Sequence, residues 1–286
     1  MTDSLTGIAP AKLNLFLHII GRRDDGYHAL ESVFRFVDYG DTVTMRVRDD
    51  TRICRLYTMP DVPAEQDLCV RAARLLQQAS GTRRGVDIQL VKRLPMGGGL
   101  GGGSSDAATV LMGLNRLWQL GWSRSQLQAL ALDLGADVPV FIFGASAFAR
   151  GIGEQLQPIQ LEPAWYLVMI PSVSVSTAQV FAHQGLTRDT KPIKMSDFIG
   201  LQSMYDSTHN DLQSVVCEKY PAVAQNLAWL SRYASARMTG SGACVFAQFK
   251  DKQSAMAVHG NIPRHLRGWV AQGLDLHPLY TWVHGD

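Results

Sequence analysis

The sequence predicts an α+β protein with two domains. Segments with strand and helix character are mixed along the chain, without the regular strand–helix–strand rhythm of a doubly wound sheet. The 286 residues are enough for one large domain or two smaller ones. A dense glycine cluster at 97–103 lies between a segment with strand character and one with helix character. Ordered glycines cost backbone entropy, so the cluster indicates a ligand-binding loop and not only a structural connection.

Alternating and helical patterns define the elements of the first half of the chain. Val43, Met45 and Val47 alternate with polar residues, as in a half-buried strand. Asp67 is suited to cap the start of a helix, and Gly81 its end. We expect strands at 12–20 and 86–94, two strands within 32–48 around a turn at Tyr39–Gly40, and helices at 67–81, 105–120 and 124–134.

The second half predicts shorter elements and one irregular segment. We expect two strands within 139–159 around a glycine turn, a strand at 164–171, a short helix at 176–183, a polar loop at 185–208, two helices around Pro221, a strand–turn–strand at 236–249, a helix at 251–259 and a strand at 269–272. A boundary near residues 150–160 divides the chain into domains 1–155 and 156–286.

Composition narrows the class of protein. Lys+Arg total 27 and Asp+Glu 25, so the net charge of +2 gives no reason to expect a nucleic-acid or membrane partner. The start of the chain lacks a signal-like apolar core, and Pro171 and polar residues interrupt the uncharged run 164–182. The four cysteines form no metal-ligand spacing. We expect a cytoplasmic protein, a monomer or weak homodimer, that binds a small molecule.

The glycine cluster is suited to phosphate binding. Ser104 can cap the helix that follows, and Ser105 and Asp106 fall in its first turn. A helix N-terminus favours an anion, and glycines let backbone N–H groups wrap around phosphate oxygens. A flexible linker is the alternative, but strand and helix are too close together for one.

Three common nucleotide motifs do not fit. Gly98 and Gly103 have the P-loop spacing, but Ser104 stands where that motif needs lysine. The dinucleotide pattern is met formally by Gly97, Gly99 and Gly102, but no βαβ continuation follows. The protein-kinase loop lacks its downstream H-R-D and D-F-G partners.

Three ordered motifs instead resemble the GHMP kinases, the superfamily of galactokinase, homoserine kinase, mevalonate kinase and phosphomevalonate kinase. They are "LPMGGGLGGGSSDAA" (94–108), "APAKLNLFL" (9–17) and "MTGSGACVFA" (238–247). The resemblance implies a two-domain α+β fold, with a left-handed βαβ unit in an N-terminal ATP domain and an active-site cleft between the domains. It also implies ATP and Mg²⁺, and an ATP site made of Pro95, Met96, Gly97, Gly98, Gly99, Leu100, Gly101, Gly102, Gly103, Ser104 and Ser105.

Further segments are similar to one kind of GHMP kinase, which phosphorylates an alcohol that carries cytidine diphosphate. They are 10–34, "LGADVPVF" (134–141) and "HNDLQSVV" (209–216). By this resemblance Lys12 is catalytic and Asp137 is the general base, which would accept the proton of the alcohol. Taken alone, Lys12 would be read as a surface residue and Asp137 as part of an Asx turn.

The segment "DGYH" (25–28) is the part of the resemblance that bears on the substrate. By resemblance, Tyr27 and His28 recognise cytosine by stacking and hydrogen bonding, and Phe181 covers the other face of the base. Taken alone, Tyr27 would be a core tyrosine with its hydroxyl in water and His28 a surface histidine. The remaining residues expected at the substrate are Asn14, Phe34 and Thr177.

Several points stay open at this stage. Asn210 and Asp211 are read equally well as a helix cap or as part of the site. Metal ligands are unassigned, because no glutamate matches the one in related kinases; Ser105 could offer a hydroxyl, and Asp106 stands where the superfamily has a small residue. The rival functions are another GHMP kinase that acts on homoserine, mevalonate or a sugar, a nucleotide sensor without catalysis, and a nicotinamide-dependent oxidoreductase.

Overall fold

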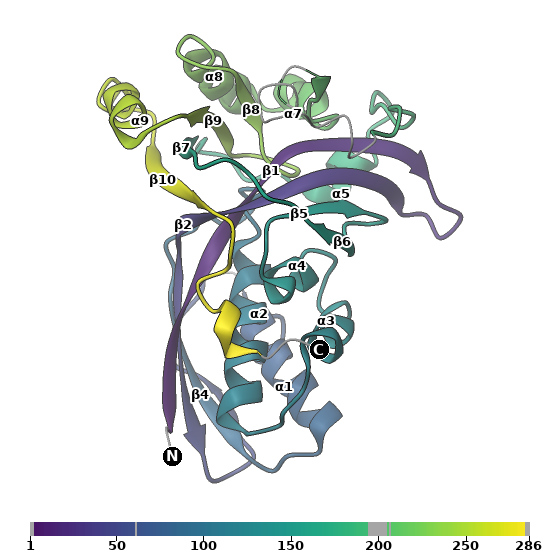
Figure 1. Cartoon of the computed structure of the whole chain (residues 1–286), viewed down its shortest axis with the longest axis vertical. Coiled ribbons are helices and arrows are strands. Elements are labelled where there is room, and N and C mark those ends of the chain that lie inside the picture. Colours follow the sequence, from purple (N-terminus) through teal and green to yellow (C-terminus); the bar gives the residue numbers. More distant parts are fainter. Residues whose placement is uncertain (1–2, 61, 194–204, 206, 284–286) are drawn as a thin grey trace.

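A long antiparallel hairpin connects the two ends of the molecule in the computed structural model. The structure describes residues 3–60, 62–193, 205 and 207–283. Strands β1 (Ser4–Arg22) and β2 (His28–Arg48) pair over nearly their whole length. In Figure 1 they rise from the lower end and bend across the upper half. The hairpin therefore brings residues of the N-terminal segment to both halves.

The bend in the hairpin replaces the turn expected at Tyr39–Gly40. β2 continues through these residues, and the register against β1 shifts between Pro10 and Ala11. Gly40 packs so closely that an added Cβ would lie 2.2 Å from the carbonyl oxygen of Ala9. The prediction of two strands was therefore wrong, because a bulge with a glycine at its tight contact bends a strand without ending it.

Helices cover one face of the hairpin in the lower half (Figure 1). The elements are β3 (Ile53–Arg55), α1 (Leu68–Ser80), β4 (Gly85–Val91), α2 (Gly102–Leu117), α3 (Arg124–Ala131) and α4 (Val138–Phe143). β3 and β4 pair in parallel across α1, so this segment is a βαβ unit. The predicted caps Asp67 and Gly81 are confirmed, and an apolar face of α2, including Leu111 and Leu114, is buried.

The upper half is built on the remaining strands. These elements are β5 (Ala147–Arg150), β6 (Gln155–Pro158), β7 (Trp165–Met169), α5 (Thr177–Phe181), α7 (Gln213–Lys219), α8 (Pro221–Leu230), β8 (Ala236–Met238), β9 (Val245–Phe249), α9 (Lys252–His259), β10 (Gly268–Leu274) and η2 (Tyr280–Trp282). The sheet order β3-β4-β2-β10-β7-β9-β8 joins the two halves, because β10 pairs with β2. After β10, Leu279 and Val283 return to the lower core.

Most predicted elements are confirmed, with one exception of type. Residues 138–143 form α4, where a strand was expected; a short apolar run has no periodicity that separates the two. Part of the loop expected at 185–208 lies outside the described residues. The expected domain boundary, between residues 155 and 156, falls at the start of β6 and stays a prediction.

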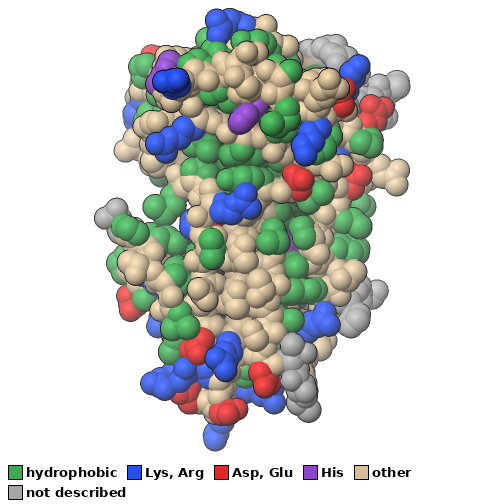
Figure 2. Space-filling model, turned by 90° about the vertical axis from the view of Figure 1, so that its left-hand side faces the viewer, with side chains coloured by type: hydrophobic (Ala, Val, Ile, Leu, Met, Phe, Trp, Pro, Cys, Tyr) green, Lys and Arg blue, Asp and Glu red, His purple; other side chains and the backbone are tan. Residues whose placement is uncertain are grey.

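Charged side chains of both signs are interspersed at the lower end of the face in Figure 2. Near the end of β2, Arg48 forms ion pairs of 2.8 Å with both Asp50 and Asp87. All four cysteines are free thiols. None of the helices in the described part of the chain has the length and apolar character that crossing a bilayer requires.

Candidate active site

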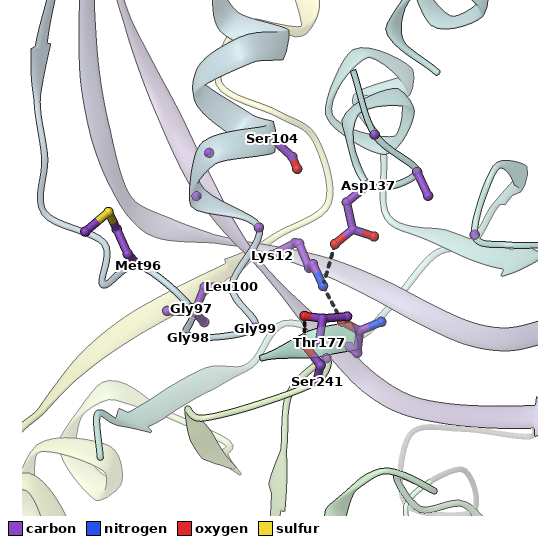
Figure 3. A pocket seen from close by; sticks show the side chains of 18 of the residues that line it. Lys12, Met96, Gly97, Gly98, Gly99, Leu100, Ser104, Asp137, Thr177 and Ser241 are labelled. Carbon is purple, nitrogen blue, oxygen red and sulfur yellow. Dashed lines mark hydrogen bonds and ion pairs between the residues drawn. The ribbon is translucent and has the colours of Figure 1, made fainter. Parts of the chain in front are cut away.

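The predicted site residues gather around one cavity of about 940 Å³. The segment from Pro95 to Ser104 lines it, and so do all the residues expected at the substrate and at the catalytic centre. Ser105 is the exception, because its place on α2 turns it into the core, where it is fully buried. In Figure 3, Lys12 and Asp137 point toward one another, and the glycine loop, Thr177 and Ser241 lie close by.

Lys12 is a buried cation with two oxygen partners. The β-bulge between Pro10 and Ala11 lies just before it, and its own N–H donates to the carbonyl oxygen of Leu100 at 3.0 Å. Its Nζ lies 3.2 Å from Asp137 Oδ2 and donates to Asn14 Oδ1. Only 3% of the lysine side chain is exposed, against 41% for Asp137. The pair therefore combines a fixed ammonium with a carboxylate that a ligand can reach.

Asn14 orients the ammonium of Lys12. Asn14 Nδ2 donates to Ser32 Oγ at 2.7 Å, and that hydroxyl donates to the carbonyl oxygen of Phe16 at 2.6 Å. These bonds fix the amide so that Oδ1 faces Lys12. The backbone N–H of Asn14 donates to Thr239 Oγ1 at 2.9 Å, so the same residue ties β1 to the turn after β8.

The Asp137 carboxylate does not serve as a helix cap. It stands before α4, and its side chain makes no capping hydrogen bond there. The Asx-turn reading is therefore not what the structure shows. Pro139 occupies the first turn of α4, where its missing N–H costs nothing. The carboxylate is left to pair with Lys12 and to face the cavity.

The glycine loop needs glycine for both conformation and space. Gly97, Gly99 and Gly101 have φ values of +65°, +72° and +71°, which L side chains rarely adopt. A Cβ on Gly99 would lie 2.2 Å from the carbonyl oxygen of Thr239. The N–H groups of Ala243 and Cys244 donate to the oxygens of Gly97 and Gly98, each at 3.1 Å. The loop is thus held against the 239–243 turn.

The start of α2 differs from the prediction. The N-cap is Gly101, without a capping side chain, and not Ser104, which lies in the first turn. The first N–H groups of a helix have no intrahelical acceptors. Gly102, Gly103 and Ser104 line the cavity, so this end of α2 offers its N–H groups and positive dipole end to an anion there.

The sequence reading missed an ionic triad next to the loop, two of whose members, Lys92 and Asp106, line the cavity. Lys92 Nζ lies 2.7 Å from Asp106 Oδ2 and 2.5 Å from Asp41 Oδ2. Asp106 is thereby paired with a cation and does not oppose a phosphate as a free charge. Burial raises the pKa of Asp106 to about 7, although Lys92 favours its charged form. The position of Lys92, directly before the loop, was the signal available in the sequence.

Aromatic side chains form the opposite end of the cavity. The rings of His28 and Phe181 lie 5.1 Å apart at 32°, so the hairpin and α5 bring two predicted substrate residues together. Tyr27 also lines the cavity and is 60% exposed. Burial and the nearby Arg188 and Arg22 lower the pKa of His28, which favours the neutral imidazole. This end can present flat faces and hydrogen-bonding edges to a planar ring.

Asn210 and Asp211 have structural partners in the described part of the chain. Asn210 Nδ2 donates to the carbonyl oxygens of Met238 and Gly240, at 2.9 and 2.8 Å. Asp211 accepts hydrogen bonds from the N–H of Ile19 and the hydroxyl of Thr190. Neither residue lines the cavity, and α7 begins only at residue 213. Asn210 therefore shapes the turn beside the glycine loop.

An apolar arm of the cavity was also missed. Its lining includes Met59, Val62, Leu68 and Leu90, which come from separate elements around α1 and β4. No motif connects these residues along the sequence, and only the tertiary structure brings them together. The cavity thus has an apolar arm beside the glycine loop, a charged centre and an aromatic end.

Models of one protein family match segments in both halves of the chain. The family model described as "GHMP kinases N terminal domain" matches residues 67–145, and that described as "GHMP kinases C terminal" matches residues 200–268. A crystal structure of 4-(cytidine 5'-diphospho)-2C-methyl-D-erythritol kinase is similar, with a TM-score of 0.81 and 32% identity over 94% of this chain and 99% of that one. A homoserine kinase from Cytophaga hutchinsonii, 18% identical with a TM-score of 0.69 over 97% and 96% of the two chains, shares the fold.

Two curated relatives are much closer in sequence. A protein of Nitrosospira multiformis named 4-diphosphocytidyl-2-C-methyl-D-erythritol kinase is 59% identical, over 96% of this chain and 93% of its own length. The protein of the same name from Thiobacillus denitrificans is 58% identical, over 96% and 97%. The two-domain GHMP fold and the kinase class expected from the sequence are thereby confirmed. The chain belongs to the 4-diphosphocytidyl-2-C-methyl-D-erythritol kinase family of GHMP kinases.

Proposed function

We propose that this kinase transfers the γ-phosphoryl group of ATP to the 2-hydroxyl of 4-diphosphocytidyl-2-C-methyl-D-erythritol, a step toward isoprenoid precursors. The observation that carries the proposal is the Lys12–Asp137 pair, which lines one cavity together with the glycine loop and the aromatic residues. A phosphate donor on the loop and a base-bearing acceptor at the aromatic end would meet at this pair.

The chemistry follows from the two side chains. Asp137 accepts the proton of the acceptor hydroxyl as its oxygen bonds to the γ-phosphorus of ATP. The bond from that phosphorus to the bridging oxygen breaks, and ADP leaves with the electron pair. Lys12, fixed by Asn14, offsets negative charge on the transferring group without having to reorient. The transfer is direct, with no phosphorylated enzyme.

We place the remaining parts of ATP and of the acceptor at the two ends of the cavity. The triphosphate lies along the glycine loop and the first turn of α2, and the apolar arm holds the adenine ring. The cytosine lies between Tyr27 and Phe181, with its edge toward His28. Thr177, whose hydroxyl lies 2.7 Å from that of Ser241, borders the path between the aromatic end and the loop.

The oxygen donors present suit a Mg²⁺ ion that is held mainly by nucleotide. In the described part of the chain, no three His, Cys, Asp or Glu side chains gather into a metal-binding cluster. The hydroxyl of Ser104, in the first turn of α2, lines the same cavity (Figure 3). Mg²⁺ in kinases takes most of its ligands from phosphates and water, so this one hydroxyl would suffice from the protein. The ion would supply neutralisation of phosphate charge.

The test is ADP release by the purified protein with ATP and Mg²⁺, with four acceptors assayed in parallel. These are 4-diphosphocytidyl-2-C-methyl-D-erythritol, mevalonate, homoserine and galactose. Turnover with the cytidylyl compound alone is expected, because only that acceptor has a base for the aromatic end. Turnover with another acceptor would overturn the substrate assignment, and no turnover with any of the four, despite ATP binding, would overturn the proposed activity.

A further inference from the structure

Arg188 lies behind the aromatic end of the cavity and is held by four acceptors. Its Nη2 donates to the carbonyl oxygens of Phe181 and His183, at 3.1 and 2.7 Å, and its Nη1 to that of Leu186 at 3.1 Å. Its Nε donates to Nε2 of His28 at 3.1 Å. Arg188 is not among the residues that line the cavity. One guanidinium therefore joins the histidine of the hairpin to the end of α5.

The bond from Arg188 determines which nitrogen of His28 carries the proton. A guanidinium is a donor only and does not deprotonate in proteins, so Nε2 of His28 must be the acceptor. The neutral ring then has its hydrogen on Nδ1. The neutral form is favoured, because burial, Arg188 and Arg22 all lower the pKa of His28. His28 lines the cavity, so Nδ1–H is the ring donor that it can offer to a ligand there.

We propose that Arg188 is a positioning residue for base specificity: it fixes the Nδ1–H tautomer of His28 and the backbone at Phe181, so that the pocket donates a hydrogen bond to an acceptor on the base edge. Cytosine offers acceptors at N3 and O2, whereas uracil carries a hydrogen on N3 and opposes this donor there. The proposal rests on the function proposed above, and it adds the residue that makes the pocket discriminate.

The first measurement is the ¹⁵N spectrum of the imidazole nitrogens in the full-length protein, with the His28 signals assigned by their loss in His28→Gln. Unprotonated Nε2 and protonated Nδ1 are expected for His28 without any substrate. The opposite tautomer in the wild-type protein would overturn the proposal, even if no Arg188 variant folds. Because this readout needs no turnover, it is independent of the acceptor assay, which tests the proposed function itself.

The second measurement uses Arg188→Met, which removes the donor, and Arg188→Lys, which keeps one. Arg188→Met should raise the KM for the cytidylyl substrate about tenfold, the loss expected when one hydrogen bond to the base weakens. Its kcat and its KM for ATP should not change, the Nδ1–H tautomer should lose its dominance, and discrimination against the uridylyl analogue should fall. Arg188→Lys should restore most of the KM.

Arg232→Met is the matched control, because Arg232 contacts the carbonyl oxygen of Trp229 and the rings of Trp229 and Tyr233. It should leave both substrate KM values and the His28 signals unchanged. An unchanged KM in Arg188→Met would overturn the proposal. So would a raised KM with the His28 tautomer unaltered, because Arg188 would then act only on the shape of the fold.

Discussion

Replacing Gly99 with alanine tests whether the glycine loop works by close backbone contact with the C-terminal half. Gly99 has a φ of +72°, and an added Cβ would lie 2.2 Å from the oxygen of Thr239 and 3.0 Å from that of Gly242. Both contacts are backbone atoms, which cannot rotate away. The loop would have to move about 1 Å, since carbon and oxygen need roughly 3.2 Å.

The size of the effect follows from two contributions. An L residue in the left-handed region costs about 1 kcal/mol. Moving the loop also weakens the hydrogen bonds from Ala243 to Gly97 and from Cys244 to Gly98, at about 1 kcal/mol each. The free energy of unfolding should therefore fall by about 3 kcal/mol, which is about 6 °C in Tm for a chain of this size. A 1 Å displacement of the phosphate site should lower kcat about 100-fold.

Gly121→Ala is the matched control. Gly121 has nearly the same φ, +69°, but nothing lies within 4 Å of its added Cβ. This variant should lose about 2 °C in Tm for the conformational cost alone and keep full kcat. Thermal unfolding and ADP release, measured on both variants, separate the contributions. If Gly99→Ala matched Gly121→Ala in both Tm and kcat, the reasoning about close contact would be refuted.

Three further variants test the catalytic centre, the aromatic end and the triad. Asp137→Asn should keep the fold and ATP binding but lose at least about 100-fold in kcat, as expected for a general base; near-normal turnover would exclude that role. Phe181→Ala should raise the KM for the cytidylyl substrate about tenfold, because base stacking is lost, and an unchanged KM would remove Phe181 from the site. Asp106 keeps its proton up to about pH 7 in the folded protein but only to 3.8 when unfolded. The folded state therefore binds more protons between these values, and its stability falls as pH rises, by up to about 3 kcal/mol from pH 5 to 7. Asp106→Asn should raise Tm more at pH 8 than at pH 5, and an equal change at both would contradict the titration.

The elements with strong local signals could be predicted from the sequence. Asp67 and Gly81 bound α1 as expected, because caps act within a few residues of the helix end. The strands around the 239–243 turn are likewise confirmed. α4 was misread as a strand, since six apolar residues have no decisive period. β2 was divided at Gly40 because a bulge and a turn share the same residue types.

The site, like the fold, has parts that the sequence predicted and parts that it did not. Lys12 and Asn14 fall in the strand expected at 12–20, and both line the cavity, since alternate residues of a strand share a face. The cap of α2 is Gly101 and not Ser104, because the glycine loop enters the helix three residues earlier than the serine suggested. Lys92 and Asp41, 51 residues apart, form a triad with Asp106 that was not predicted, because the place of Lys92 before the loop was its one local signal.

The sequence by itself determined the kind of protein: its mixed elements, its phosphate-binding loop and the three ordered motifs of a kinase. Those signals depend on near neighbours along the chain, through backbone freedom, caps and alternation. Only the tertiary structure decided that Lys12 lies 3.2 Å from Asp137, that Asp106 is paired, and that Arg188 reaches His28. These contacts join residues 14 to 160 positions apart. Their distances follow from how the hairpin bends and how α2, α4 and α5 pack around it.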